Sequence, residues 1–93
     1  MAIGLLETQG LTDAVEALDA MCKDAMVELI EMKRAGGGLV TSIIRGDVAA
    51  VTSAVEAGEA VVRQYGGTLI FVYVIPSPHP DLSRYLTPGG DGR

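Results

Sequence analysis

The chain has 93 residues and a formal net charge of −5, and 48% of its residues are hydrophobic while 20% are charged. This length suits a single domain near the small end of what folds alone. Seven scattered Lys and Arg residues lack the clustered footprint of a nucleic-acid binder, and no apolar run approaches the ~20 residues of a membrane span. So small a domain cannot bury this many apolar side chains by itself, which predicts a homo-oligomer.

The N-terminal segment is predicted to be a strand over residues 2–8 that ends at Gln9-Gly10. It has no basic flank, so we interpret it as part of the fold and not as a signal peptide. A helix is expected next, with Thr12 as its N-cap and Asp13 at the positive end of its dipole. Its apolar stripe is expected at Leu11, Ala14, Val15, Leu18, Met21, Cys22 and Ala25.

A second strand is predicted over residues 26–33, although Ile30-Glu31-Met32 blurs its alternation. Ala35 and the glycines Gly36, Gly37 and Gly38 then form a tight turn into an apolar strand, residues 39–44, which makes a hairpin. Arg45 and Gly46 are expected to break this strand, and Asp47 to cap the following helix.

The second helix is predicted from Val48 to about Tyr65, with Gly66-Gly67 as its C-terminal stop. Gly58 falls on its apolar stripe, which is reasonable only where another element packs against the backbone. Residues 68–75 are apolar throughout, which predicts a strand covered on both faces. After Pro76 we expect one helical turn over residues 81–86 and a flexible tail over residues 87–93.

The order strand, helix, strand, strand, helix, strand is typical of the ferredoxin-like split βαβ fold of the α+β class. It predicts a four-stranded antiparallel sheet with two helices on one face. The other face has no helix to cover it, which again indicates association or a ligand surface.

Residues suited to catalysis are few. His79 is the only histidine and has no Cys or His cluster with which to bind a metal, and Cys22, the only cysteine, excludes an internal disulfide and suits a reducing cytosol. The glycine turn has no following lysine and opens a strand, unlike a phosphate-binding loop. Arg45-Gly46-Asp47 matches an adhesion tripeptide, but strand end, turn and helix cap is the simpler interpretation. We expect no enzyme, no cofactor and no metal site.

Several short motifs, in register over residues 2–86, resemble the shell proteins of bacterial microcompartments, in particular the single-domain kind that forms hexamers. They are Gly4-Leu5, Glu7-Thr8, Gly10, Asp19-Ala20-Met21 with Lys23, Gly36-Gly37-Gly38, Leu39-Val40-Thr41, Arg45-Gly46-Asp47-Val48, Ala57-Gly58, Val74-Ile75-Pro76 and Pro78-His79. The resemblance implies one shell domain over residues 1–86, with the tail over residues 87–93. It also implies a flat homohexamer that tiles into a shell in the bacterial cytoplasm.

The resemblance further implies roles for individual residues. Gly36, Gly37 and Gly38 match a loop that lines a central pore for small metabolites, and Arg34 stands at its mouth. Lys23 matches a lysine that packs between neighbouring hexamers. The partners implied are other hexamers, paralogous shell proteins and encapsulated enzymes, with no nucleic acid and no membrane.

Two positions depart from this family pattern. Many relatives carry arginine where this chain has Ser77, in the edge segment that also contains His79. The absence of this arginine removes up to five hydrogen-bond donors per copy. Sheets of hexamers are therefore expected to be weaker or to need a paralogue. Several relatives carry serine where this chain has Gly37, so the pore is expected to be wider or differently selective.

Two other functions remain open from the residues alone. A ferredoxin-like domain is also compatible with a small-molecule-binding regulatory module, in which the glycine turn grips a ligand. A small enzyme is a weaker alternative because paired acid and base groups are missing.

Overall fold

The computed structural model describes residues 1–23 and 26–76. It contains four strands, two α-helices and a short 3₁₀ turn in the predicted order. They are β1 (Ala2–Gln9), α1 (Leu11–Cys22), β2 (Val27–Arg34), η1 (Gly36–Gly38), β3 (Leu39–Gly46), α2 (Val48–Gln64) and β4 (Leu69–Ile75). The helical turn expected over residues 81–86, the domain limit at residue 86 and the tail lie outside the described residues.

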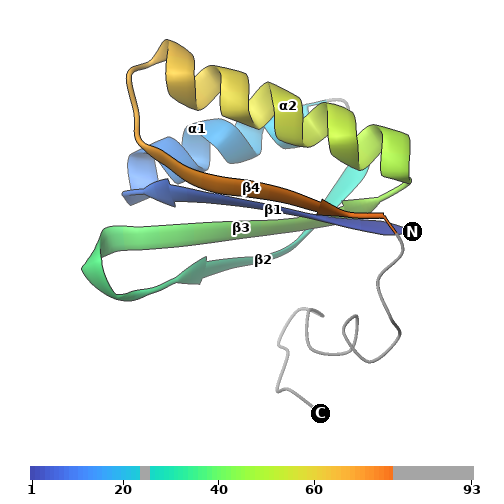
Figure 1. The fold of residues 1–93 in the computed structure, drawn as a ribbon, viewed down its shortest axis with the longest axis horizontal. Helices are drawn as coiled ribbons and strands as arrows, with labels where there is room; N and C mark the ends of the chain where they lie inside the picture. The colour runs from blue at the N-terminus through green and yellow to red at the C-terminus, as the bar shows by residue number, and fades with distance from the viewer. Residues whose placement is uncertain (24–25, 77–93) are drawn as a thin grey trace.

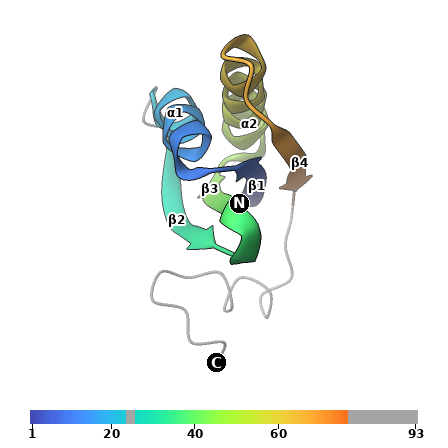
Figure 2. The same cartoon turned by 90° about the vertical axis from the view of Figure 1, so that its left-hand side faces the viewer.

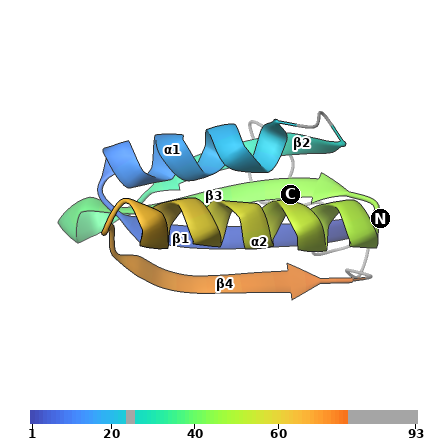
Figure 3. The same ribbon diagram turned by 90° about the horizontal axis from the view of Figure 1, so that it is seen from above.

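The strands form one antiparallel sheet in the order β2-β3-β1-β4. Both helices lie on the same face of this sheet, and no described helix covers the other face (Figures 1 and 2). Seen from above, α1 runs beside β2 and β3, α2 runs along β1, and β4 follows the outer edge (Figure 3). The predicted ferredoxin-like α+β fold is therefore confirmed.

The main core lies between the sheet and the helices. Leu6 and Ile44 from the central strands pack against Val51, Val55 and Val62 of α2, and all five side chains are buried. Burial of each such aliphatic side chain contributes about 1.5–3 kcal/mol. The core explains why the apolar residues of α2 repeat at helical spacing.

Gly58 lies where α2 crosses α1 and the sheet. A Cβ atom at this position would lie 2.8 Å from Cγ of Met21 and 3.0 Å from Cδ1 of Leu6. The expectation that another element packs against this glycine is confirmed.

A smaller cluster lies on the face without helices. Ile3, Ile30 and Ile43 are buried there, beside an ion pair between Arg45 and Glu28. The pairing of β2 with β3 shifts register between Leu29 and Glu31. This irregularity is of the β-bulge kind, in which an extra residue on one strand changes the side-chain alternation. It explains why the alternation of β2 is blurred in the sequence.

Helix α1 begins differently from the prediction. Gly10, with φ of 96°, occupies the N-cap position, and no side chain caps the helix, so the assignment of Thr12 as N-cap is wrong. The chain turns sharply here because the N–H group of Gly10 donates to the carbonyl of Gly38 at 2.7 Å. A positive φ of this size favours glycine.

The predicted apolar stripe of α1 is also partly wrong. The buried residues are Ala14, Ala17 and Met21, whereas Leu11 and Val15 are exposed. Cys22 is only half-buried. Burial and the neighbouring Asp19 carboxylate raise the pKa of its thiol. The helix therefore turns a second row of apolar residues away from the core.

Arg45 and Gly46 do not break β3, which continues through both residues. Gly46 pairs with Ala2 on one side and Val27 on the other, so the strand is held by two neighbours to its end. A Cβ atom on Gly46 would lie 3.0 Å from the carbonyl oxygen of Met26, so the close approach of β2 explains the glycine. Asp47 caps α2 as predicted, accepting from the N–H group of Ala49 at 3.2 Å.

Helix α2 ends one residue before the predicted limit. Gly66 follows with φ of 73°, and the N–H group of Gly67 donates to the carbonyl of Val62 at 2.9 Å. These features satisfy the last carbonyls of the helix, so the predicted glycine stop is confirmed. Val48 and Tyr65, the two limits of the predicted helix, are exposed.

Strand β4 is apolar throughout but is not covered on both faces in the single protomer. It lies at the edge of the sheet, and Ile70, Phe71 and Tyr73 are exposed. The rings of Phe71 and Tyr73 meet edge to face, with centroids 5.9 Å apart. The prediction of a doubly covered strand is wrong for the isolated chain, and its apolar composition needs another explanation.

Candidate functional site

The glycine turn is the exposed tip of the β2–β3 hairpin. Gly36, Gly37 and Gly38 are all exposed, and a Cβ atom on Gly36 or Gly37 would meet nothing within 4 Å. Gly37 and Gly38 have φ of 77° and 82°, a backbone conformation that glycine adopts at little cost. The turn therefore needs glycine for its backbone shape and leaves open space around it.

Hydrogen bonds fix the shape of this turn from two directions. At its base, the N–H group of Ala35 donates to the carbonyl of Leu39 at 2.8 Å. From the end of β1, the Gln9 side chain donates to the carbonyl of Gly37 at 2.6 Å. Gln9 was not singled out in the sequence, where a polar residue before a glycine carries no distinctive signal.

Arg34 is the last residue of β2 and is exposed next to the turn. Its guanidinium group therefore adds positive charge at the base of the hairpin tip. Arg34 therefore lies beside the glycine turn, two residues before Gly36, and its role at a pore stays a prediction.

Lys23 lies toward the opposite end of the molecule. It follows α1 as its C-cap and is exposed, and α1 ends beside the half of β2 that is farther from the glycine turn (Figure 3). Eight-residue strands span about 26 Å, so the start of β2 lies about that far from the glycine turn. Arg45, Gly46 and Asp47 also lie at the Lys23 end, where they complete β3 and cap α2. The other two predicted edge residues, Ser77 and His79, lie outside the described residues.

The two long sides of the molecule both expose apolar side chains. One side is a groove between α1 and β2, lined by Val15, Leu18, Asp19, Cys22, Lys23 and Leu29. The other side is β4, with Ile70, Phe71 and Tyr73 exposed. The two surfaces lie at opposite edges of the sheet and differ in composition and shape.

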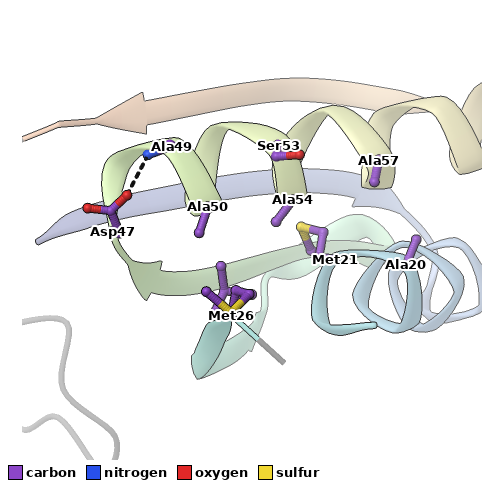
Figure 4. Close-up of a pocket in the computed structure, with 10 residues that line it drawn as sticks. Ala20, Met21, Met26, Asp47, Ala49, Ala50, Ser53, Ala54 and Ala57 are labelled. Carbon is purple, nitrogen blue, oxygen red and sulfur yellow. Dashed lines mark hydrogen bonds between the residues drawn. The ribbon is translucent and has the colours of Figure 1, made fainter. Parts of the chain in front are cut away.

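A pocket of about 470 Å³ lies between the ends of α1 and α2 (Figure 4). Its lining is mostly alanine and methionine, and its polar side chains are Asp47 and Ser53. The Asp47 carboxylate already accepts the N–H group of Ala49. Ligand sites usually converge several polar groups on an apolar cavity, and this pocket does not.

Other kinds of site are not found in the part of the chain that the structure describes. No group of three or more His, Cys, Asp or Glu side chains there has the arrangement of a metal site. No helix among residues 1–23 and 26–76 is long and apolar enough to cross a membrane.

Comparison with known proteins gives consistent matches. The profile of a family described as the BMC domain matches residues 2–78. The shell protein PduA of Citrobacter freundii is 50% identical over 88 residues, covering 95% of this chain and 94% of PduA. EutM of Escherichia coli K12 is 47% identical over 91 residues, covering 98% and 93%. The carboxysome shell protein CsoS1A of Hydrogenovibrio crunogenus is 41% identical over 87 residues, covering 94% and 91%.

A solved structure agrees with the fold. The crystal structure of a microcompartment protein from Desulfitobacterium hafniense superposes with a TM-score of 0.81 at 36% identity. The match covers 89% of this chain and 47% of that chain, so the present protein spans about half the length of that structure. With the sequence matches, this similarity extends over nearly the whole described fold. The chain therefore belongs to the BMC domain family, whose matched members are bacterial microcompartment shell proteins.

Proposed function

We propose that the protein is a structural tile of a bacterial microcompartment shell in the cytoplasm, and not an enzyme. In this proposal six copies form a closed ring, and the glycine turns meet around its axis to frame a pore for small metabolites. The relatives that match over most of the chain are shell proteins. The observation that supports the ring is the placement of three surfaces on one protomer. These surfaces are the glycine turn at one end and, on the two sides, the α1–β2 groove and strand β4.

The two apolar sides support a ring. A two-fold dimer buries the same patch on both subunits, whereas a head-to-tail contact joins two different patches and closes into a ring when its rotation permits. The α1–β2 groove and the exposed strand β4 are different patches at opposite edges of the sheet. A ring contact between them would cover β4 and explain why its sequence is apolar throughout.

The two ends of the protomer are suited to two different places in the proposed ring, its centre and its outer rim. The glycine turn lies at one end, and Lys23 lies toward the other. If the sides contact neighbours, one end faces the axis and the other faces outward. Glycines at the axis leave the widest opening, and Arg34 adds positive charge beside it.

At the rim, Lys23 is proposed to contact neighbouring hexamers. Its long aliphatic stem covers apolar surface while its ammonium group donates to carbonyls across the edge. Ser77 and His79 are proposed to belong to the same edge. Because Ser77 stands where many relatives have arginine, co-assembly with a paralogous shell protein is proposed to strengthen the sheet. The enclosed enzymes would contact one face of it.

Native mass spectrometry tests the ring directly. We expect an assembly of about 58 kDa, six times the chain mass of 9.7 kDa. A monomer at micromolar concentration would refute the proposal. Saturable binding of a small metabolite to a protein with a closed axis would favour the regulatory-module alternative instead.

Electron microscopy of assembled sheets tests the rim. Lys23 lines only the end of the α1–β2 groove that lies away from the glycine turn, so Lys23→Ala should leave the ring mass unchanged and impair sheet formation. Lys33→Ala is the matched control, because Lys33 is also an exposed lysine but belongs to β2 near the glycine turn. Normal sheets from Lys23→Ala, or equal impairment in both variants, would contradict the assignment of Lys23 to the edge.

A further inference from the structure

Gln9 extends from the end of β1 to the glycine turn. Its Nε2 atom donates to the carbonyl oxygen of Gly37 at 2.6 Å. The same nitrogen would lie 2.8 Å from a Cβ atom on Gly38, so the amide group rests against the turn. Only the NH₂ half of the amide can donate to a carbonyl, so the chemistry of this bond fixes the orientation of the Gln9 side chain.

The next residue along the chain makes a second bond to the turn. The N–H group of Gly10 donates to the carbonyl of Gly38 at 2.7 Å. Two consecutive carbonyls of the turn are therefore bonded to two consecutive residues at the β1–α1 junction. Each bond turns one carbonyl toward the body of the protomer.

These bonds matter because three consecutive glycines are otherwise the most freely rotating kind of backbone. A peptide group that is not held can rotate and present its carbonyl oxygen to either side. Rings of backbone carbonyls at an axis are the devices by which selective channels coordinate cations. A rotated Gly37 carbonyl, repeated around a ring, would create such a device.

We propose that Gln9 is a positioning residue of the pore, which keeps the Gly37 carbonyl turned away from the opening and so prevents a cation-coordinating ring. This proposal rests on the proposed ring of glycine turns. With Gln9 in place, the pore presents the backbone hydrogens of the glycines and the charge of Arg34 to solutes. This arrangement favours anionic and neutral polar metabolites over cations.

The restraint itself can be measured without reference to a pore. Gln9→Met keeps the length of the side chain and removes its donor. Residue-resolved hydrogen exchange should show the amides of Gly10 and Ala35, which bond across the turn, exchanging about fivefold faster, as expected for the loss of one hydrogen bond. Gln64→Met is the matched control, because Gln64 is the other glutamine and is exposed at the end of α2. Unchanged exchange in Gln9→Met would overturn the proposal.

A rescue variant separates the lost donor from a general disturbance. Gln9→Lys supplies an ammonium group of similar reach, so the exchange rates of Gly10 and Ala35 should return toward the wild-type values. If Gln9→Lys exchanges as fast as Gln9→Met, the donated bond is not the cause and the proposal fails.

The effect on selectivity is tested with hexamers in planar bilayers under a KCl gradient. The reversal potential of Gln9→Met should shift toward cation selectivity relative to wild type and Gln64→Met. A looser turn with unchanged selectivity would overturn the assignment of Gln9 to the pore. Native mass spectra of the same samples report separately whether the ring exists, so failure of the proposed function is distinguished from failure of this inference.

Discussion

Gly4 and Gly58 lie inside the molecule and Gly36 and Gly37 lie at an exposed hairpin tip, and the two pairs are glycine for different reasons. A Cβ atom on Gly4 would lie 2.8 Å from Val51 and 2.9 Å from Val55, and one on Gly58 would be equally crowded. A Cβ atom on Gly36 or Gly37 would meet nothing within 4 Å. The inner glycines are therefore required by packing, whereas space in the protomer does not explain the outer ones.

The comparison separates glycines that packing within the protomer requires from glycines that it does not require. Substitutions at the inner positions should lower the free energy of unfolding because neighbouring atoms have to move. At the outer positions only backbone conformation limits the residue. Unfolding should be compared at one fixed protein concentration, because association raises apparent stability.

The largest expected effect is that of Gly58→Val. Its added methyl groups collide with Met21 and Leu6, which should lower the free energy of unfolding by about 2–3 kcal/mol. Chemical denaturation measures this loss. Ala60→Val is the control, because Ala60 lies on the exposed side of the same helix and should change stability by less than about 0.5 kcal/mol. Equal losses in the two variants would contradict the packing argument.

Gly4→Ala should have the next largest effect, a loss of about 1–2 kcal/mol. The crowding atoms belong to Val51 and Val55, so removing one of them should relieve the collision. Val55→Ala should therefore cost about 1 kcal/mol less in the Gly4→Ala background than in the wild type. Strictly additive losses in this double-mutant cycle would argue against direct contact.

Gly37→Ala should cost about 1 kcal/mol, because its φ of 77° disfavours a Cβ atom although space is open. Gly37→Asn should cost less, since asparagine tolerates this conformation. Gly36→Ala is the matched control, because Gly36 is not among the glycines with positive φ, and it should change stability by less than about 0.5 kcal/mol. Thermal denaturation of the three variants checks the order, and a reversed order would contradict the backbone argument.

Features set by neighbouring residues were predictable from the sequence. The Asp47 cap, the glycine stop after α2 and the β2–β3 hairpin each depend on a few consecutive side chains, and the structure confirms them. The same holds for the fold class, which follows from the order of the elements. The family resemblance was visible for a related reason, since its motifs are short and lie in register.

Features set by distant segments were missed. Thr12 suits an N-cap, but the bond from Gly10 to Gly38 places the start of α1 earlier. Gly46 reads as a break, but strands on both sides hold it in the sheet. For β4, the apolar sequence signals burial without saying whether the cover comes from the same chain or another copy. The roles of Lys23, Arg34 and the glycine turn stay predictions because they concern contacts between copies.

The unlike sides of the protomer have a consequence for mixed populations. In the proposed head-to-tail ring, every subunit would give one surface to the neighbour before it and the other surface to the neighbour after it. A paralogue that keeps both surfaces can occupy any place in the circle, so one shell gene can be diversified without redesigning its partners. A copy that keeps only one surface can bind one neighbour but cannot bind the next, so the ring does not close. A variant damaged only in β4 would therefore act dominantly over intact copies in the same cell.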